Sequence, residues 1–66
     1  MNDLADLFLS TLRYWNDRYR GKPRLVYVNP SDYDELLGGL SLMDGWWNGI
    51  RIIGKESINK NQLVFV

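Results

Sequence analysis

The stretch Pro23-Arg-Leu-Val-Tyr-Val-Asn-Pro-Ser-Asp-Tyr-Asp-Glu-Leu36 determines the fold, because it joins a strand directly to a helix. Residues 25–28 are all aliphatic or aromatic. A strand with both faces apolar is typical of a position between two neighbours in a sheet. Pro30 has no N–H to donate to a ladder and disfavours helical geometry at Asn29, so we expect the strand, over residues 24–29, to end there.

A helix over about residues 31–40 is predicted to follow without a linker. Ser31 is expected to cap it by accepting a hydrogen bond from an N–H group of the first turn. Carboxylates favour the positive end of the helix dipole, and three occur close together here: Asp32, Asp34 and Glu35. We therefore interpret this acidic group as helix-start residues rather than as general acids or cation ligands.

Outward from this stretch, the chain carries one more helical pattern and two more strand patterns. Apolar residues recur at spacings of three and four over residues 3–20, which predicts an amphipathic helix that ends at Gly21. Residues 49–53 and 63–66 are predicted to form strands, with Arg51 and Ile53 on one face of the former. The predicted order is α-β-α-β-β.

This order predicts a single α+β domain over residues 1–66. A strand–helix–strand unit closes with its strands parallel, and a short polar loop before the last strand favours an antiparallel hairpin with the strand before it. We therefore expect a small three-stranded mixed sheet with two helices packed on one face. The opposite face would be open and partly apolar, which indicates a binding partner.

Composition excludes several classes of function. The 66 residues contain no Cys and no His, so no disulfide, thiolate ligand, Cys nucleophile or Ser/His/Asp set exists. The glycines match no phosphate-binding loop. We therefore predict no enzyme activity, no cofactor and no metal.

Net charge is zero, and no apolar run is long enough to span a bilayer. With an acidic rather than basic N-terminal stretch, the chain is expected in the cytoplasm of a host cell or in a virion, neither secreted nor in a membrane.

Trp46 and Trp47 are the first candidate partner-binding residues. They lie between the turn dipeptides Asp44-Gly45 and Asn48-Gly49. Exposed Trp is a strong anchor for a protein partner, whereas buried Trp would close the end of a small core. Successive residues of an extended segment point in opposite directions, so we expect one ring in the core and one outside.

Five basic residues form the second candidate site: Arg13, Arg18, Arg20, Lys22 and Arg24. Aromatic residues are interleaved with them, and this combination can bind a phosphate backbone and stack on bases. The same arginines would bind carboxylates of a protein partner. The alternative is simple charging of a helix C-terminus together with a solvated loop.

The chain resembles a segment of the major capsid proteins of tailed bacteriophages, over about residues 4–66. The likeness rests on an amphipathic helix and on the residues that follow: Leu25 to Asn29, Pro30, Ser31, Asp32, Tyr33, Leu36, Gly49, Ile50, Ile52, Ser57, Ile58 and Leu63 to Val66. A capsid subunit is several times longer, with an N-terminal arm, an extended loop and a long spine helix that this chain lacks. The resemblance implies a phage or prophage origin and a fold used for protein–protein contact.

Three functions follow from these patterns. The first is a virion-related or capsid-domain-like interaction module that self-associates as a homo-oligomer. The second is a small phage regulatory or anti-defence protein that binds and inhibits a host protein or nucleoprotein. The third, less favoured at zero net charge, is a nucleic-acid-binding protein.

Overall fold

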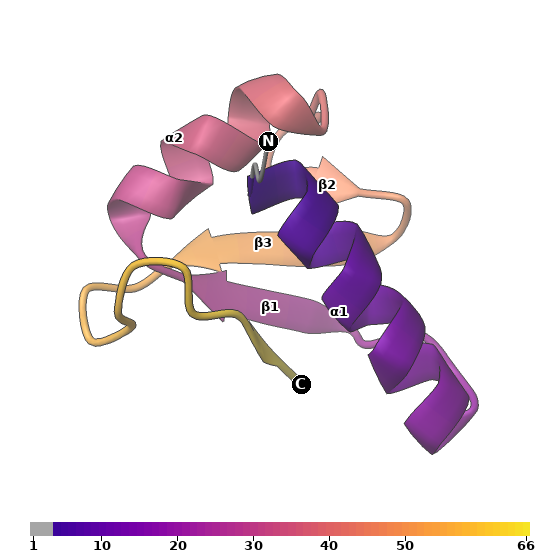
Figure 1. Ribbon diagram of the computed structural model, residues 1–66. Coiled ribbons are helices and arrows are strands. Elements are labelled where there is room, and N and C mark those ends of the chain that lie inside the picture. The colour runs from indigo at the N-terminus through magenta and orange to yellow at the C-terminus, as the bar shows by residue number, and fades with distance from the viewer. Residues whose placement is uncertain (1–3) are drawn as a thin grey trace.

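The chain forms two helices and one four-stranded mixed sheet, described over residues 4–66 in a computed structural model (Figure 1). The elements, in chain order, are α1 (Leu4–Tyr19), β1 (Leu25–Val28), α2 (Pro30–Gly39), β2 (Trp46–Trp47), β3 (Ile50–Gly54) and β4 (Val64–Phe65). The predicted α+β class is correct, but the sheet has four strands instead of three.

The sheet is ordered β2-β3-β1-β4, which places β1 in its interior. β1 and β3 are parallel, with Leu25 opposite Arg51 and Val28 opposite Gly54. The predicted parallel pairing across the strand–helix–strand unit is therefore confirmed. The two outer strands are antiparallel to their neighbours, β2 to β3 and β4 to β1.

The predicted hairpin between the last two strands is wrong, because β4 pairs with β1 and not with β3. The connection after β3 is fixed at the end of β1 instead. The Lys55 N–H donates to the Val28 carbonyl oxygen at 2.7 Å, and Asn29 Nδ2 donates to the Ile58 carbonyl oxygen at 2.9 Å. These bonds carry the chain past the end of β1, so the last strand reaches the free edge of β1.

The additional strand, β2, results from two consecutive tight turns. Asn48 and Gly49 have φ values of 52° and 86°, which is the left-handed pair that a two-residue hairpin requires. Asp44 and Gly45 repeat this geometry with φ values of 54° and 82°. Sequence reasoning identified both dipeptides as turns, but it did not predict that the two residues between them would pair with β3.

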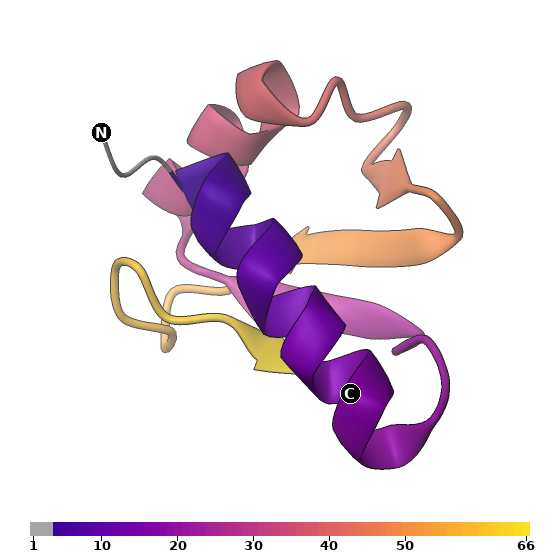
Figure 2. The same ribbon diagram turned by 45° about the vertical axis from the view of Figure 1, so that its right-hand side comes forward.

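The core lies on one face of the sheet. Val26 and Val28 of β1 and Ile50 and Ile52 of β3 are buried, and the residues between them in each strand are not. The other residues of the hydrophobic core cluster come from the helices: Leu4, Phe8 and Leu12 from α1 and Leu36 from α2. Figures 1 and 2 show α1 crossing in front of the sheet, with α2 beside its N-terminal half. Both helices therefore pack on the same face, as expected.

The helix ends differ in detail from the prediction. Asn29, not Ser31, caps α2: its Oδ1 accepts a hydrogen bond from the Ser31 N–H at 2.9 Å, and Pro30 is the first helical residue. At the other boundary, α1 ends at Tyr19 because Arg20, rather than Gly21, adopts a left-handed φ of 56°. The expected start of this helix at Asp3 lies outside the described residues.

Candidate functional site

The face of the sheet that points away from the helices carries two rows of side chains, which we call the outer face. The pairing register places Trp46, Arg51 and Leu25 in one row, across β2, β3 and β1. The second row contains Ile53, Tyr27 and Val64, across β3, β1 and β4. Residues opposite one another on paired strands lie on the same face, so each row is continuous.

Most of the outer face is apolar and accessible. Trp46 is 45% exposed, and its neighbour Arg51 is also exposed. The other four residues of the two rows are half-buried, and none of the six belongs to the core cluster or to the hydrophobic residues packed against it. Val66, the next alternate residue after Val64, is 55% exposed. Neither helix covers this face.

Two cations lie over aromatic rings of the outer face. The Arg51 guanidinium carbon is 5.7 Å from the centroid of the Trp46 ring, and Lys55 Nζ is 4.9 Å from the centroid of Tyr27. Both distances are within the range of cation–π attraction. The long side chains of Arg51 and Lys55 are therefore held near the sheet. They lie at the two ends of an apolar strip formed by Leu25, Tyr27 and Ile53.

The two tryptophans point in opposite directions, as predicted. Trp47 lies opposite Ile50 and contacts the core: its ring meets Phe8 edge to face, with centroids 5.5 Å apart and planes at 87°. Trp46 lies opposite Arg51 and belongs to the outer face. Of the two candidate anchors, only Trp46 therefore has a surface position suited to a partner, whereas Trp47 is a packing residue.

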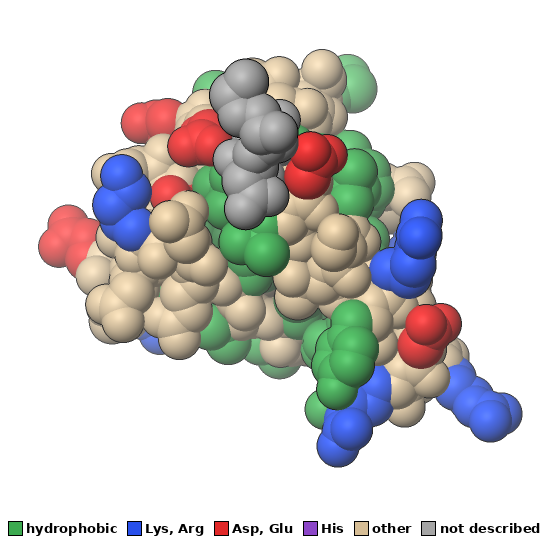
Figure 3. Space-filling model, viewed as in Figure 1, with side chains coloured by type: hydrophobic (Ala, Val, Ile, Leu, Met, Phe, Trp, Pro, Cys, Tyr) green, Lys and Arg blue, Asp and Glu red, His purple; other side chains and the backbone are tan. Residues whose placement is uncertain are grey.

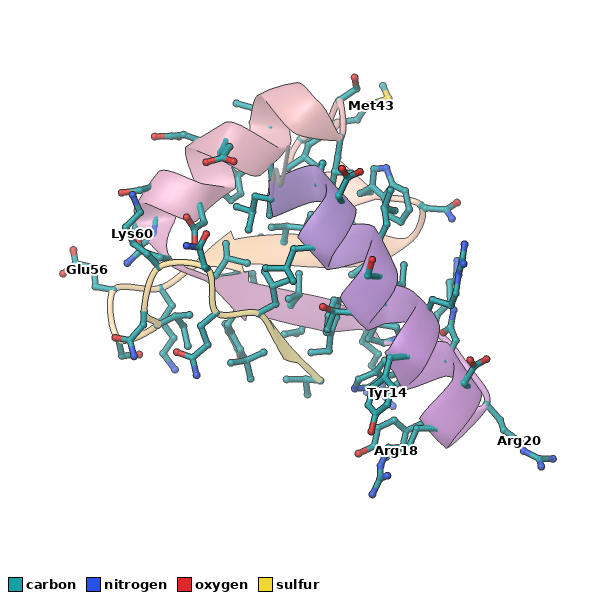
Figure 4. The ribbon with its side chains drawn as sticks, viewed as in Figure 1. Tyr14, Arg18, Arg20, Met43, Glu56 and Lys60 are labelled. Atoms are coloured by element: carbon teal, nitrogen blue, oxygen red, sulfur yellow. The ribbon has the colours of Figure 1, made fainter. Side chains whose placement is uncertain are left out.

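The residues of the predicted basic cluster are all exposed at the surface. Arg13, Arg18, Arg20 and Arg24 are exposed around the end of α1 and the connection that follows, and Figure 3 shows blue side chains spread over this region at the lower right. Figure 4 shows Arg18 and Arg20 pointing away from each other. Lys22 has a structural contact, since its Nζ donates to the Asn48 carbonyl oxygen at 2.7 Å.

The aromatic residues of this region are occupied by one another and by Arg18. The rings of Trp15 and Tyr19 are 4.5 Å apart, and Arg18 lies 5.7 Å from the Tyr19 centroid. The pKa of Arg18 is raised above its ordinary value, first by a hydrogen bond with Tyr19 and then by charge interactions with Tyr19 and Tyr14. Arg18 thus interacts with both tyrosines, whose side chains remain 65% (Tyr14) and 58% (Tyr19) exposed.

Sequence reasoning missed the outer-face cations as site residues. The signal was present for Arg51, since the alternation in residues 50–53 placed it on the face opposite Ile50 and Ile52. Lys55 follows β3 directly, and no local pattern indicated that it would return over Tyr27. Two hydrophobic residues of the outer face, Leu25 and Val64, come to lie beside β3 and Tyr27 only through the order of the strands in the sheet.

One buried carboxylate has a structural role. Asp32 is 1% exposed, and its Oδ2 accepts a hydrogen bond from the backbone N–H of Asn61 at 2.5 Å. Asp32 was interpreted from the sequence as a helix-start charge, and it additionally holds the loop that leads into β4. Within residues 4–66, no group of three or more His, Cys, Asp or Glu side chains could hold a metal ion. Neither described helix has the length and hydrophobicity needed to cross a bilayer.

Comparison of the chain with protein-family models, with curated proteins and with solved structures gave no significant match.

Proposed function

We propose that this protein is a non-enzymatic binding module that docks on another protein through the outer face of its sheet. The observation that carries the proposal is the pair of apolar rows, centred on Leu25, Tyr27 and Ile53, which neither helix covers. Interfaces use the same combination of features: an apolar centre, Trp and Tyr anchors, and Arg near them.

The outer face is the centre of a larger contact surface. Four strands about 4.8 Å apart, the longest of five residues, give a sheet face on the order of 300 Å². A protein partner of standard size covers about 800 Å² on each side of an interface. A partner of that size would therefore contact the sheet face together with the exposed side chains around its rim.

A foreign partner is favoured over a second copy. In a two-fold face-to-face dimer, each outer face would meet an identical face. The strand residues of that face carry Arg51 but no Asp or Glu to receive it. The regulatory or anti-defence function, in which the protein binds a host protein, is therefore our leading candidate. The self-associating, capsid-domain-like function is second, and the same apolar face supports it.

Site-specific photo-crosslinking in the cell that expresses the protein tests this proposal. A benzophenone-bearing phenylalanine would replace Trp46 on the outer face, and the control would carry it at Leu37 of α2, on the helix side of the sheet, which is 45% exposed, as Trp46 is. We expect a discrete adduct from position 46 and none from position 37. Equal yields from the two positions, or no adduct from position 46, would contradict the proposal.

Light scattering of the purified protein separates the two candidate functions. A monomer at high micromolar concentration is expected for a module that binds a foreign protein. A stable dimer or larger assembly that Trp46→Ala dissociates would instead support self-association through the outer face.

A further inference from the structure

Resting on this proposed function, we infer that the outer face recognises an acidic amphipathic helix of its partner. Two carboxylates of that helix would pair with Arg51 and Lys55, and apolar side chains between them would cover the strip formed by Leu25, Tyr27 and Ile53.

The outer face has more cationic than acidic side chains. Among the described residues, the six outward-facing strand positions include one cation and no Asp or Glu, and a second cation, Lys55, lies over the same face. The chain as a whole has equal numbers of acidic and basic residues. This surface is therefore locally positive on a neutral molecule, and carboxylates are the groups on a protein that form charge-assisted hydrogen bonds with Arg and Lys.

Aromatic rings hold the two cations of the outer face in position. Each cation lies over an aromatic ring, Arg51 over Trp46 and Lys55 over Tyr27. Both side chains are therefore already positioned beside the sheet before a partner binds. Side chains that are already positioned lose less conformational freedom when they bind. The aromatic rings thus arrange the two positive groups to receive a partner while leaving the aliphatic residues between them uncovered.

The spacing of the cations defines the partner. Arg51 and Lys55 are four residues apart along one extended segment, which is about 13 Å at roughly 3.3 Å per residue. Two residues seven positions apart on an α-helix lie on one face and about 10.5 Å apart, and the flexible Arg and Lys side chains can span the remainder. The matching pattern is Glu-x-x-Leu-Leu-x-x-Glu, whose central leucines would meet the apolar strip.

Single-stranded nucleic acid fits this face less well. Bases stack on open aromatic faces, but here a cation occupies a position over each ring. The centre of the strip is aliphatic, with Leu25, Ile53 and Val64 beside Tyr27. An apolar side chain covers such a centre better than a nucleobase does, so a protein segment is the better match.

The test uses a synthetic helical peptide with the Glu-x-x-Leu-Leu-x-x-Glu pattern, and a matched peptide in which both Glu are replaced by Gln. Binding is followed by backbone amide chemical shifts of the isotopically labelled full chain. We expect the Glu peptide to shift amides of β1, β3 and β4 and to bind about tenfold more tightly than the Gln peptide, since an exposed ion pair contributes a factor of up to about five. This difference should shrink as salt is added.

Protein variants assign the effect to the two cations. Arg51→Glu combined with Lys55→Glu should weaken the Glu peptide by about tenfold or more. Lys60→Glu is the control, because Lys60 is exposed in the loop before β4, outside both rows (Figure 4). This change should leave binding within twofold. The amide spectrum of each variant verifies that the fold is retained.

The outcomes separate this inference from the proposed function. Equal binding of the Glu and Gln peptides to the outer face would overturn the acidic preference while leaving the docking surface intact. Shifts caused by an oligothymidylate but not by either peptide would overturn it in favour of nucleic acid. Absence of binding by any probe would also overturn it, whereas the docking function itself is decided by the contrast between cross-linking at positions 46 and 37.

Discussion

Replacement of Phe8 by Leu tests whether one aromatic side chain of α1 holds the sheet together. Phe8 is completely buried, and its ring contacts Trp47 of β2 and Phe65 of β4, with a centroid separation of 5.5 Å in each case. These two strands are the opposite edges of the sheet. A single side chain on the helix therefore joins both edges to the core.

The expected loss of stability follows from these contacts. An aromatic pair contributes about 0.5–1.5 kcal/mol beyond the area that it buries, so losing two pairs costs about 1–3 kcal/mol. Leu also fills less volume than Phe, so we expect the free energy of unfolding to fall by about 2–3 kcal/mol. This loss is smaller than the approximately 3–5 kcal/mol of a Phe→Ala change. A chain of this length has a total unfolding free energy of only about 3–10 kcal/mol.

Urea unfolding followed by far-ultraviolet circular dichroism measures this loss. With a denaturant dependence of about 1 kcal/mol per molar urea for a small domain, the midpoint for Phe8→Leu should fall by about 2–3 M. The control is Leu9→Ala on the same helix, where the side chain is exposed and the expected change is within about 0.5 kcal/mol. If Phe8→Leu lowers the midpoint no more than Leu9→Ala does, the packing of α1 across both sheet edges is refuted.

Three further changes test the turn, the buried carboxylate and the outer face. Gly49→Ala should destabilise the fold by about 1–2 kcal/mol because φ there is +86°, whereas Gly21→Ala, with open space around it, should be nearly neutral; equal urea midpoints would contradict this. Asp32→Ala should cost about 2 kcal/mol by removing a charged acceptor and should raise the hydrogen-exchange rate of the Asn61 amide, and an unchanged rate would show that the contact does not hold the loop. Trp46→Ala should change stability by less than about 1 kcal/mol, and a collapse of folding would assign Trp46 to the core.

The central strand and its helix could be predicted because local chemistry specifies them. Residues 25–28 are apolar on both faces, and in the structure Val26 and Val28 enter the core while Leu25 and Tyr27 form the centre of the outer face. Pro30 and Asn29 determine the boundary between strand and helix, although the capping group is Asn29 rather than Ser31. Each of these features depends on residues within a few positions of one another.

The candidate site could be predicted only in part. Alternation correctly placed one tryptophan outside, because neighbouring residues of a strand point to opposite faces. The basic residues near the end of α1 are close in sequence, but Arg18 and Arg20 point away from each other, and Lys22 donates a hydrogen bond to the turn before β3. The two cations at the ends of the apolar strip are Arg51 and Lys55. The pairing of the strands brings them close to Trp46 and Tyr27.

The pairing of β4 with β1 is the feature that local sequence could not predict. Two hydrogen bonds across 29 positions, from Asn29 to Ile58 and from Asn61 to Asp32, hold the final loop against the start of α2. They place Phe65 opposite Val26 and beside Phe8. Turn residues and apolar periodicity specify each segment through its immediate neighbours, whereas the choice between two possible strand partners depends on contacts that exist only after the chain has folded.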